Sequence, residues 1–293
     1  MSHKFWIVDS FTRERFAGNP AGVVLQEGEL SHDDMLRIAG ELSLETAFVD
    51  RSGVAARVAY YTGVSRVPLC GHDTIALGKV LSDTGAWAEG EPLEIVTDAG
   101  ALTLARSDDG RVWMSQALPV LGAAVSRETI AGMLGIDAVV IAAYPEPRIV
   151  STGTPMLFVR LLDAAAVDLL RPDMKRLASG LKSLSEHADG IYVWTADDAA
   201  ENIYSRCFAP GVGLPEDPVT GSASGALGSY ITQTTGPRVG QDEYAYCITQ
   251  GVAMGRPGNA EVRVTWDGEK VTRVRVGGHA VIVAEGTLRE QVK

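Results

Sequence analysis

The sequence predicts an α/β protein made of two similar halves, and three observations carry this prediction. Five short blocks occur twice, in the same order, along the 293 residues. Most of the other apolar segments have the length of β-strands, about four to eight residues, and are rich in Val, Ile, Tyr and Phe. Each half ends in two alternating apolar runs joined by an Asp-Gly pair, at Asp109-Gly110 and at Asp267-Gly268, which is typical of a β-hairpin.

The repeated blocks define the two halves. Each block pairs a segment of the first half with one of the second: GNPAGVV with GTPMLFV, ETAFV with DGIYV, CGHDTIALG with TGSASGALG, EIVTDAG with CITQG, and one hairpin with the other. We expect an N-terminal half over residues 1–120, joined by the C-terminal segment 280–293, and a C-terminal half over residues 121–279. The stretch at 118–126 is the expected crossover between them.

Two further helices are indicated by capping residues. Ser31 precedes a segment whose apolar residues have helical spacing, and Ser126 precedes another that ends before Gly135. A serine at the N-cap and a glycine just after the last turn are the preferred residues at those positions.

The composition excludes several classes of partner. The formal net charge is −11 and no run of lysines and arginines occurs, so neither nucleic acid nor an anionic membrane surface is expected to bind. Three cysteines cannot form an even disulfide framework. The N-terminal MSHKFWIVDSF lacks a signal-peptide pattern, and the longest apolar run is too short to span a bilayer. We expect a cytoplasmic protein.

The two glycine-containing loops at 70–78 and 220–228 are the candidate ligand site. Each runs into a helix-compatible segment, and the N–H groups of a first helical turn attract anions. We expect the helix starts after Gly71 and Gly221 to face each other and bind a small carboxylate. The alternative is that the small residues only let two central helices pack closely.

Polar side chains in and near these loops favour the ligand site. The first loop contributes a thiol, an imidazole and a carboxylate, and the second is preceded by two acidic residues; the set is Cys70, His72, Asp73, Glu216, Asp217, Thr220 and Ser222. Pro218 biases Asp217 to an extended conformation. Side chains alternate in such a stretch, so only one of the two acidic residues is expected to enter the site.

Glu45 is the third element of the candidate site. It lies between the end of the predicted helix and the apolar strand TAFV. A carboxyl group beside so much apolar surface suits a group that carries a proton. The alternative is an exposed residue in a turn.

Taken together, the motifs resemble one known family. Seven motifs occur in the order expected of that family: FAGNPAGVV, LETAFV, PLCGHDTIA, STGTPM, EDPVTGSASGAL, TQGVAMGRPG and VRVGGHAVIV. The chain resembles the PhzF-like family of phenazine-biosynthesis-type isomerases over essentially its whole length. The resemblance implies a diaminopimelate-epimerase-like fold. In it, each of two pseudo-symmetric halves wraps a mixed β-sheet or barrel around a central helix, the active site lies between them, and the protein is a homodimer.

The resemblance also implies a reaction, in which a proton and a double bond move within a small conjugated carboxylate without any metal or organic cofactor. Glu45 matches the proton-transferring glutamate, and His72, Asp217 and Ser222 match catalytic residues that bind and orient the substrate and assist the proton transfer. The implied substrate-binding residues are Asn19, Gly71, Asp73, Thr220 and Gly221. From the residues alone, no ligands have zinc-like spacing, and neither a Walker loop nor a nucleotide-binding GxGxxG is present.

Three alternatives are weighed against this function. A racemase or epimerase would use Cys70 with a non-cysteine partner, because Thr220 stands at the matching position of the second loop. A catalytically silent protein would bind a small carboxylate and exchange no proton. A serine hydrolase is excluded because Ala223 stands where GxSxG requires the nucleophile.

Two residues depart from the family pattern. Arg66 replaces an expected acidic residue, and Asp73 replaces the alanine that usually follows the histidine. We expect either an ion pair between Arg66 and Asp73 beside the site, or a role for Arg66 in binding a second acidic group of the substrate.

Overall fold

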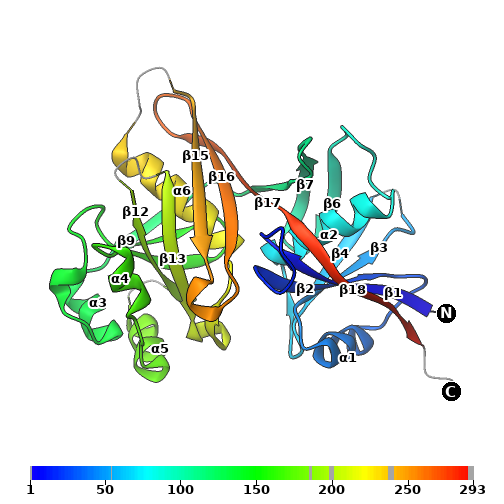
Figure 1. Cartoon of the computed structure of the whole chain (residues 1–293), viewed down its shortest axis with the longest axis horizontal. Coiled ribbons are helices and arrows are strands. Elements are labelled where there is room, and N and C mark those ends of the chain that lie inside the picture. The colour runs from blue at the N-terminus through cyan, green and yellow to red at the C-terminus, as the bar shows by residue number, and fades with distance from the viewer. Residues whose placement is uncertain (1, 54, 185–186, 198–200, 237–240, 290–293) are drawn as a thin grey trace. The chain divides into compact units, whose positions relative to one another are not determined.

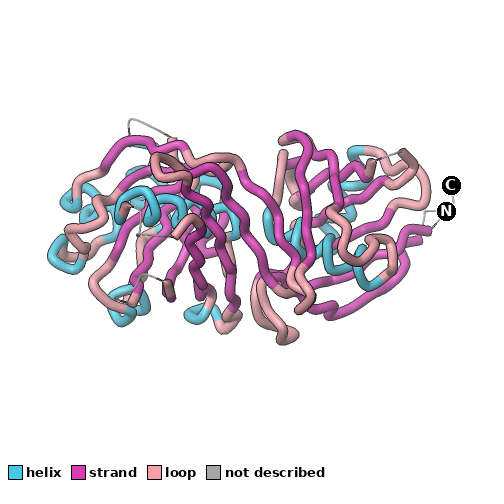
Figure 2. Tube along the Cα trace, turned by 90° about the horizontal axis from the view of Figure 1, so that it is seen from above, coloured by secondary structure: helices cyan, strands magenta, loops and turns pink. Residues whose placement is uncertain are grey.

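The computed structural model describes residues 2–53, 55–184, 187–197, 201–236 and 241–289. The chain divides into two compact units, shown in Figure 1. Unit 1 combines residues 1–115 with residues 277–293, and unit 2 comprises residues 116–276. Strands predominate in both units, as the magenta segments of Figure 2 show, so the α/β class is confirmed.

Unit 1 is a sheet with two helices. The strands and helices are β1 Ser2–Ser10, β2 Asn19–Leu25, α1 His32–Leu42, β3 Thr46–Asp50, β4 Ala56–Tyr61, β5 Arg66–Val67, α2 Gly71–Asp83, β6 Leu93–Thr97, β7 Gly100–Arg106, β8 Val112–Gln116 and β18 Ala280–Arg289. Strand β18 pairs with β1 from Ser2↔Arg289 to Ser10↔Ala280. The C-terminal strand thereby completes the N-terminal sheet.

Unit 2 has more helices around a similar sheet. Its elements are β9 Val120–Ala124, α3 Arg127–Leu134, η1 Ala138–Val140, β10 Arg148–Ser151, β11 Pro155–Arg160, α4 Ala164–Asp168, α5 Met174–Ser183, β12 Gly190–Ala196, β13 Asn202–Ala209, η2 Pro210–Val212, β14 Leu214–Asp217, α6 Gly221–Thr235, β15 Glu243–Gln250, η3 Val252–Met254, β16 Gly258–Trp266 and β17 Val271–Gly278.

The two sheets have the same pairing pattern. In unit 1, β1 pairs antiparallel with β2, β2 parallel with β3, β3 antiparallel with β4, β4 parallel with β6, and β6 antiparallel with β7. In unit 2 the same sequence of pairings joins β10, β11, β12, β13, β15 and β16. The repeated blocks therefore mark a repeated topology, and the predicted pseudo-symmetric halves are confirmed.

A central helix occupies the same place in each pattern. Helix α2 packs against β1, β2, β3 and β18, and α6 packs against β10, β11, β15 and β16. Glycines bring each helix close to its sheet. A Cβ atom at Gly78 would lie 2.6 Å from Val112, and one at Gly228 would lie 2.8 Å from Val262. Gly78 and Gly228 match in the repeat, so part of it serves helix packing.

The same repeat also preserves a hydrogen bond at the start of each central helix. Thr74 donates its Oγ1 hydrogen to the Cys70 carbonyl at 2.6 Å, and Ser224 donates to the Thr220 carbonyl at 2.8 Å. Both bonds link a residue to the carbonyl four positions earlier, which is a common arrangement for a buried helical Ser or Thr.

The outer helices form as their capping residues predict. Ser31 accepts a hydrogen bond from the Asp34 amide at the start of α1, and Ser126 accepts one from Thr129 at the start of α3. Gly135 ends α3 in the left-handed conformation. Both Asp-Gly turns are also present, with positive φ at Gly110 and Gly268.

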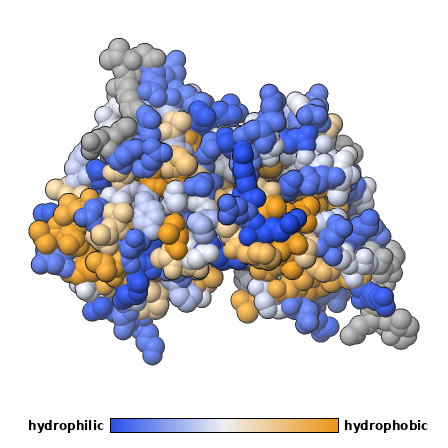
Figure 3. Space-filling model, in the orientation of Figure 1, coloured by the Kyte–Doolittle hydropathy of each residue, from blue (hydrophilic) through white to orange (hydrophobic). Residues whose placement is uncertain are grey.

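Each unit has its own apolar core. One cluster, in unit 1, joins β2, α1, β3 and β4 with Leu288 of β18. Another, in unit 2, joins α3, α5, β11, β12 and β13. Hydrophilic side chains cover much of the face drawn in Figure 3, with apolar areas among them. Among the described residues, no helix is both long and apolar enough to cross a membrane.

Candidate active site

Four functional side chains come together in unit 1. Glu45 lies two residues beyond the left-handed residue Ser43 that ends α1, directly before β3. Its carbonyl accepts the Gly22 amide hydrogen at 2.8 Å, which fixes this turn against β2. Cys70 is the N-cap residue of α2, and His72 and Asp73 are in the first turn of that helix. Ser10 of β1 donates a hydrogen bond to the His72 carbonyl at 2.7 Å.

The side chains of these residues are in direct contact. The Cys70 thiol donates a hydrogen bond to Glu45 Oε2 at 2.9 Å, and Cys70 Sγ lies 3.3 Å from His72 Nδ1. On the other side of the ring, His72 Nε2 lies 3.6 Å from Glu45 Oε2 and 3.4 Å from Asp73 Oδ1. The Glu45 side chain is 30% exposed and that of His72 is 12% exposed. Glu45 is therefore the member of the cluster most open to a ligand.

Asp73 lies beneath His72. Its side chain is fully buried, and neither carboxylate oxygen accepts a hydrogen bond from a described residue. Burial raises the pKa of Asp73 to about 7, although the charge of the adjacent His72 lowers this pKa. Asp73 thus differs from an ordinary acidic surface residue.

Cys70 retains its proton in this environment. Burial, and then the negative charges of Asp73 and Glu45, raise the pKa of the Cys70 thiol well above its ordinary value. A catalytic cysteine needs a thiolate that forms readily. The surroundings of Cys70 therefore favour a hydrogen-bond donor over a racemase base.

The same four residues could hold a metal ion. One donor atom each from Glu45, Cys70, His72 and Asp73 can be chosen so that all lie within 4.8 Å of one another. Sequence spacing did not reveal this set because Glu45 is 25 positions away from Cys70.

In unit 2, the residues before α6 form a second polar cluster. Thr220 donates its hydroxyl hydrogen to Asp217 Oδ2 at 2.5 Å. The buried Gln250 donates to the Asp217 carbonyl at 2.7 Å and accepts the Thr220 amide hydrogen at 3.2 Å. Ser222 is half-buried in the first turn of α6. Gln250 is a positioning residue that the sequence argument missed, although it ends the repeated CITQ block.

The two acidic residues before Pro218 separate as predicted. Glu216 forms a bidentate ion pair with Arg206, at 2.8 and 2.9 Å, whereas Asp217 is bound to Thr220. Arg206 is buried, and it also donates hydrogen bonds to backbone carbonyls. Glu216 therefore stabilises unit 2 through its ion pair with Arg206, and Asp217 is the remaining acidic candidate for the site.

The starts of the two central helices share an unusual feature. Neither Cys70 nor Thr220 caps its helix with a side-chain hydrogen bond. By contrast, Ser31 and Ser126 cap α1 and α3. Amide groups at a helix start without a side-chain cap suit a carboxylate ligand, and this holds for the start of α2 in unit 1 and, separately, for the start of α6 in unit 2.

Two predicted side chains have other surroundings. Asn19 is buried at the start of β2, in register with Ser10. Of the two alternatives for Arg66, the ion pair with Asp73 is wrong, and the role in binding the substrate stays a prediction. Arg66 instead pairs with Asp98, with Nε 2.6 Å from Oδ2, because its strand β5 lies beside the turn that follows β6, whereas Asp73 is buried within α2.

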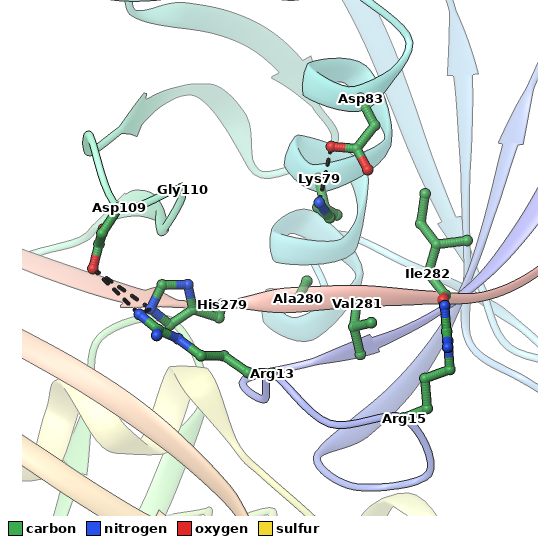
Figure 4. Close-up of a pocket in the computed structure, with 10 residues that line it drawn as sticks. All are labelled: Arg13, Arg15, Lys79, Asp83, Asp109, Gly110, His279, Ala280, Val281 and Ile282. Carbon is green, nitrogen blue, oxygen red and sulfur yellow. Dashed lines mark hydrogen bonds and ion pairs between the residues drawn. The ribbon is translucent and has the colours of Figure 1, made fainter.

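A charged pocket of about 500 Å³ lies in another part of unit 1, towards the C-terminal end of α2 (Figure 4). Arg13 and His279 both point at Asp109, and Lys79 lies 2.9 Å from Asp83. Arg13 also donates to His279 Nε2 at 2.7 Å. Most charges of this pocket are therefore paired with one another, whereas Arg15 donates to the Ile282 carbonyl at 3.1 Å, and none of the predicted site residues lines the pocket.

Comparison with known proteins identifies relatives along the whole chain. The family model described as phenazine biosynthesis-like protein matches residues 8–286. An uncharacterized isomerase of Deinococcus radiodurans is 40% identical over 291 residues, which cover 95% of this chain and 92% of that protein. The trans-2,3-dihydro-3-hydroxyanthranilate isomerase of Pseudomonas aeruginosa is 30% identical, covering 97% and 98%.

A solved structure agrees with these relatives. The phenazine biosynthesis protein of the PhzF family from Bacillus anthracis superposes with a TM-score of 0.87 and 29% identity, over 99% of this chain and all of that one. The similarity in sequence and the similarity in structure point to the same family.

Proposed function

Because this chain belongs to the family of phenazine biosynthesis-like proteins and is an isomerase, we propose that it moves a proton within a small conjugated carboxylate without a cofactor. One of its relatives is named for a substrate of this chemical kind, a dihydro-hydroxyanthranilate. The observation that carries the proposal is the half-exposed Glu45 carboxylate in contact with His72 and Cys70.

In the proposed reaction Glu45 acts as both base and acid. It removes a proton from one carbon of the substrate, and the electron pair of that C–H bond shifts the conjugated double bond. Glu45 then returns the proton to the carbon at the other end of the shifted system. Atoms and electrons balance within the substrate, so no redox partner is needed.

The neighbouring groups orient Glu45 and the substrate. The Cys70 thiol donates to Glu45 Oε2 at 2.9 Å, which holds the carboxylate in one orientation. His72 lies 3.6 Å away and assists the proton transfer. The amide groups at the start of α2, around Gly71, bind the substrate carboxylate, while Asp217, Thr220, Gly221 and Ser222 remain the predicted substrate contacts of unit 2. Asn19 is buried at the start of β2 in register with Ser10, and Asp73 takes no part in the proposed transfer.

The substitution Glu45→Gln tests this role. Glutamine keeps the size and much of the hydrogen bonding of Glu45 but cannot carry a proton, so kcat should fall by about 10²–10⁴-fold. Substrate binding, measured by calorimetry, should remain, since the loop amides are unchanged. Turnover is followed in deuterated water as incorporation of deuterium at the new sp³ carbon, with dihydro-hydroxyanthranilate and related conjugated carboxylates as substrates.

Glu41→Gln is the matched control, because Glu41 is an exposed residue on α1 and its substitution should leave turnover unchanged. Retention of turnover within tenfold by Glu45→Gln would transfer the proton-carrying role to Asp217 or His72. Exchange at a stereocentre without movement of a double bond would instead support an epimerase, and binding without any exchange would support a silent binding protein.

A further inference from the structure

Asp73 is the starting point, because the proposed proton transfer does not need it. In the repeat it occupies the position that Ala223 has in the second loop. Its carboxylate is fully buried and accepts no hydrogen bond from a described residue. Buried carboxylates in proteins are usually paired with a charge or bound to a metal.

The surroundings of Asp73 supply metal ligands. Cys70, His72 and Glu45 offer sulfur, nitrogen and oxygen donors, a combination that zinc accepts. In the part of the chain that the structure describes, no lysine or arginine is seen to hydrogen-bond or ion-pair with Glu45, Cys70 or Asp73. Two carboxylates and a thiol therefore converge on one imidazole, and a divalent cation would neutralise them.

The two carboxylates lie around His72 Nε2 at separations close to those of a tetrahedral site. With zinc–sulfur bonds of about 2.3 Å and zinc–nitrogen and zinc–oxygen bonds of about 2.0–2.2 Å, neighbouring ligand atoms lie about 3.3–3.6 Å apart. His72 Nε2 lies 3.4 Å from Asp73 Oδ1 and 3.6 Å from Glu45 Oε2. Cys70 Sγ lies 3.8 Å from Nε2 and 3.3 Å from Nδ1 of the same ring, so the Cys70 side chain has to turn towards Nε2 to complete the site. The shorter separation of 2.9 Å, between Cys70 Sγ and Glu45 Oε2, belongs to a hydrogen bond that a metal would replace.

We propose that Glu45, Cys70, His72 and Asp73 bind a thiophilic divalent cation such as Zn²⁺, and that the bound ion inhibits the isomerase. On binding, the Cys70 thiol releases its proton to solvent and binds as thiolate, His72 binds through Nε2 as neutral imidazole, and each carboxylate contributes one oxygen. A Glu45 carboxylate bound to the ion is no longer free to accept the substrate proton, so metal binding and proton transfer exclude each other. The inhibition by the bound ion rests on the proposed function, whereas the metal site itself does not.

Cobalt is the probe for the site, because Co²⁺ replaces Zn²⁺ and has a visible spectrum. The full-length protein, first freed of metal with a chelator, is titrated with Co²⁺ in the absence of substrate. We expect one equivalent to bind, with intense visible bands typical of four-coordinate cobalt and a near-ultraviolet thiolate-to-cobalt band. Zn²⁺ should displace the cobalt.

Variants assign the ligands. Cys70→Ser should abolish the thiolate band, while the matched control Cys247→Ser should keep it. Glu45→Gln and Asp73→Asn should each weaken cobalt binding at least tenfold, whereas His187→Gln, which changes the exposed His187–Asp189 pair of unit 2, should not. Circular dichroism confirms that each variant folds; if Asp73→Asn does not, Cys70→Ser and Glu45→Gln still decide the matter.

The outcomes separate the two proposals. A missing thiolate band, a band that survives Cys70→Ser, or unchanged affinity in Glu45→Gln would overturn the metal site and leave the isomerase proposal standing. Inhibition is then tested by turnover, where one equivalent of Zn²⁺ should abolish the reaction and a chelator should restore it. A zinc-loaded enzyme that turns over at the metal-free rate would overturn the inhibitory role.

Discussion

Asp73 gives the folded protein a carboxyl group whose ionisation opposes folding. Burial raises its pKa to about 7, against an ordinary value of 3.8. Between these two values the folded chain binds more protons at this site than the unfolded chain, so the free energy of unfolding decreases as the pH rises. The stabilising contribution is complete below about pH 4 and is lost by about pH 7.

The decrease of the free energy of unfolding with rising pH predicts how the variant Asp73→Asn behaves. Asparagine has no proton to lose, so the variant should gain stability relative to the parent as the pH rises. From pH 5 to pH 7 the relative gain should be roughly 2 kcal/mol, because one pKa unit corresponds to about 1.4 kcal/mol. Urea unfolding at several pH values, with a chelator present, measures it. A constant difference between the two proteins across this range would contradict the raised pKa.

Individual site residues could be predicted only where a local pattern identifies them. Glu45 was placed correctly between the end of α1 and β3, and Pro218 correctly separated Glu216 from Asp217. The predicted pairing of Arg66 with Asp73 failed because the partner of Arg66 is Asp98, 32 positions away. Strand pairing brings such residues together, and one sequence does not reveal it. Gln250 could not be predicted as a site residue for the same reason, because its partners Thr220 and Asp217 are at least 30 positions away.

At the scale of helices and turns, local chemistry was a better guide. Ser31, Ser126 and Gly135 mark helix ends, and the Asp-Gly pairs mark tight turns, because each needs only neighbouring residues. The order of strands in each sheet could not be read in this way. The parallel pairing of β13 with β15, for example, joins segments that are separated by the whole of α6.

The packing of α6 makes a prediction about its small residues. A Cβ atom at Gly225 would lie 1.9 Å from Gln116 Oε1. The Gln116 side chain cannot move freely, because it donates to the Gly221 carbonyl and accepts from Thr152. Gly225→Ala should therefore destabilise the protein by about 1–3 kcal/mol, the usual cost of overpacking.

Gly132 of α3 provides the matched control for this substitution. It is exposed, and a Cβ atom there would have no neighbour within 4 Å among the described residues. Gly132→Ala should stabilise the protein by about 0.5–1 kcal/mol, since alanine favours the helix. Denaturant unfolding compares the two variants. Stabilisation by both substitutions would show that helix propensity, and not contact with Gln116, determines the effect at Gly225.

At the scale of the whole molecule, the two units have the same topology but differ in one respect: one is continuous in sequence and the other is not. Unit 2 is continuous, from residue 116 to residue 276, whereas unit 1 takes its last strand from the other end of the chain. That strand, β18, pairs with β1 along its length and contributes Leu288 to the core around α1. Without it, β1 would become an edge strand that pairs only with β2, and the core would lose apolar contacts.

This difference predicts that residues 116–276 fold when expressed alone and that residues 1–115 do not. Residues 116–276 contain every strand pairing described within unit 2 and an apolar core of their own, so this fragment should give a mixed α/β circular dichroism spectrum and a cooperative thermal transition. Residues 1–115 lack β18 and should show no cooperative transition. Adding a synthetic peptide of residues 277–293 should restore part of that transition, because the peptide supplies the missing strand. Cooperative unfolding of residues 1–115 alone, at a temperature that the peptide does not change, would show that β18 is dispensable for unit 1.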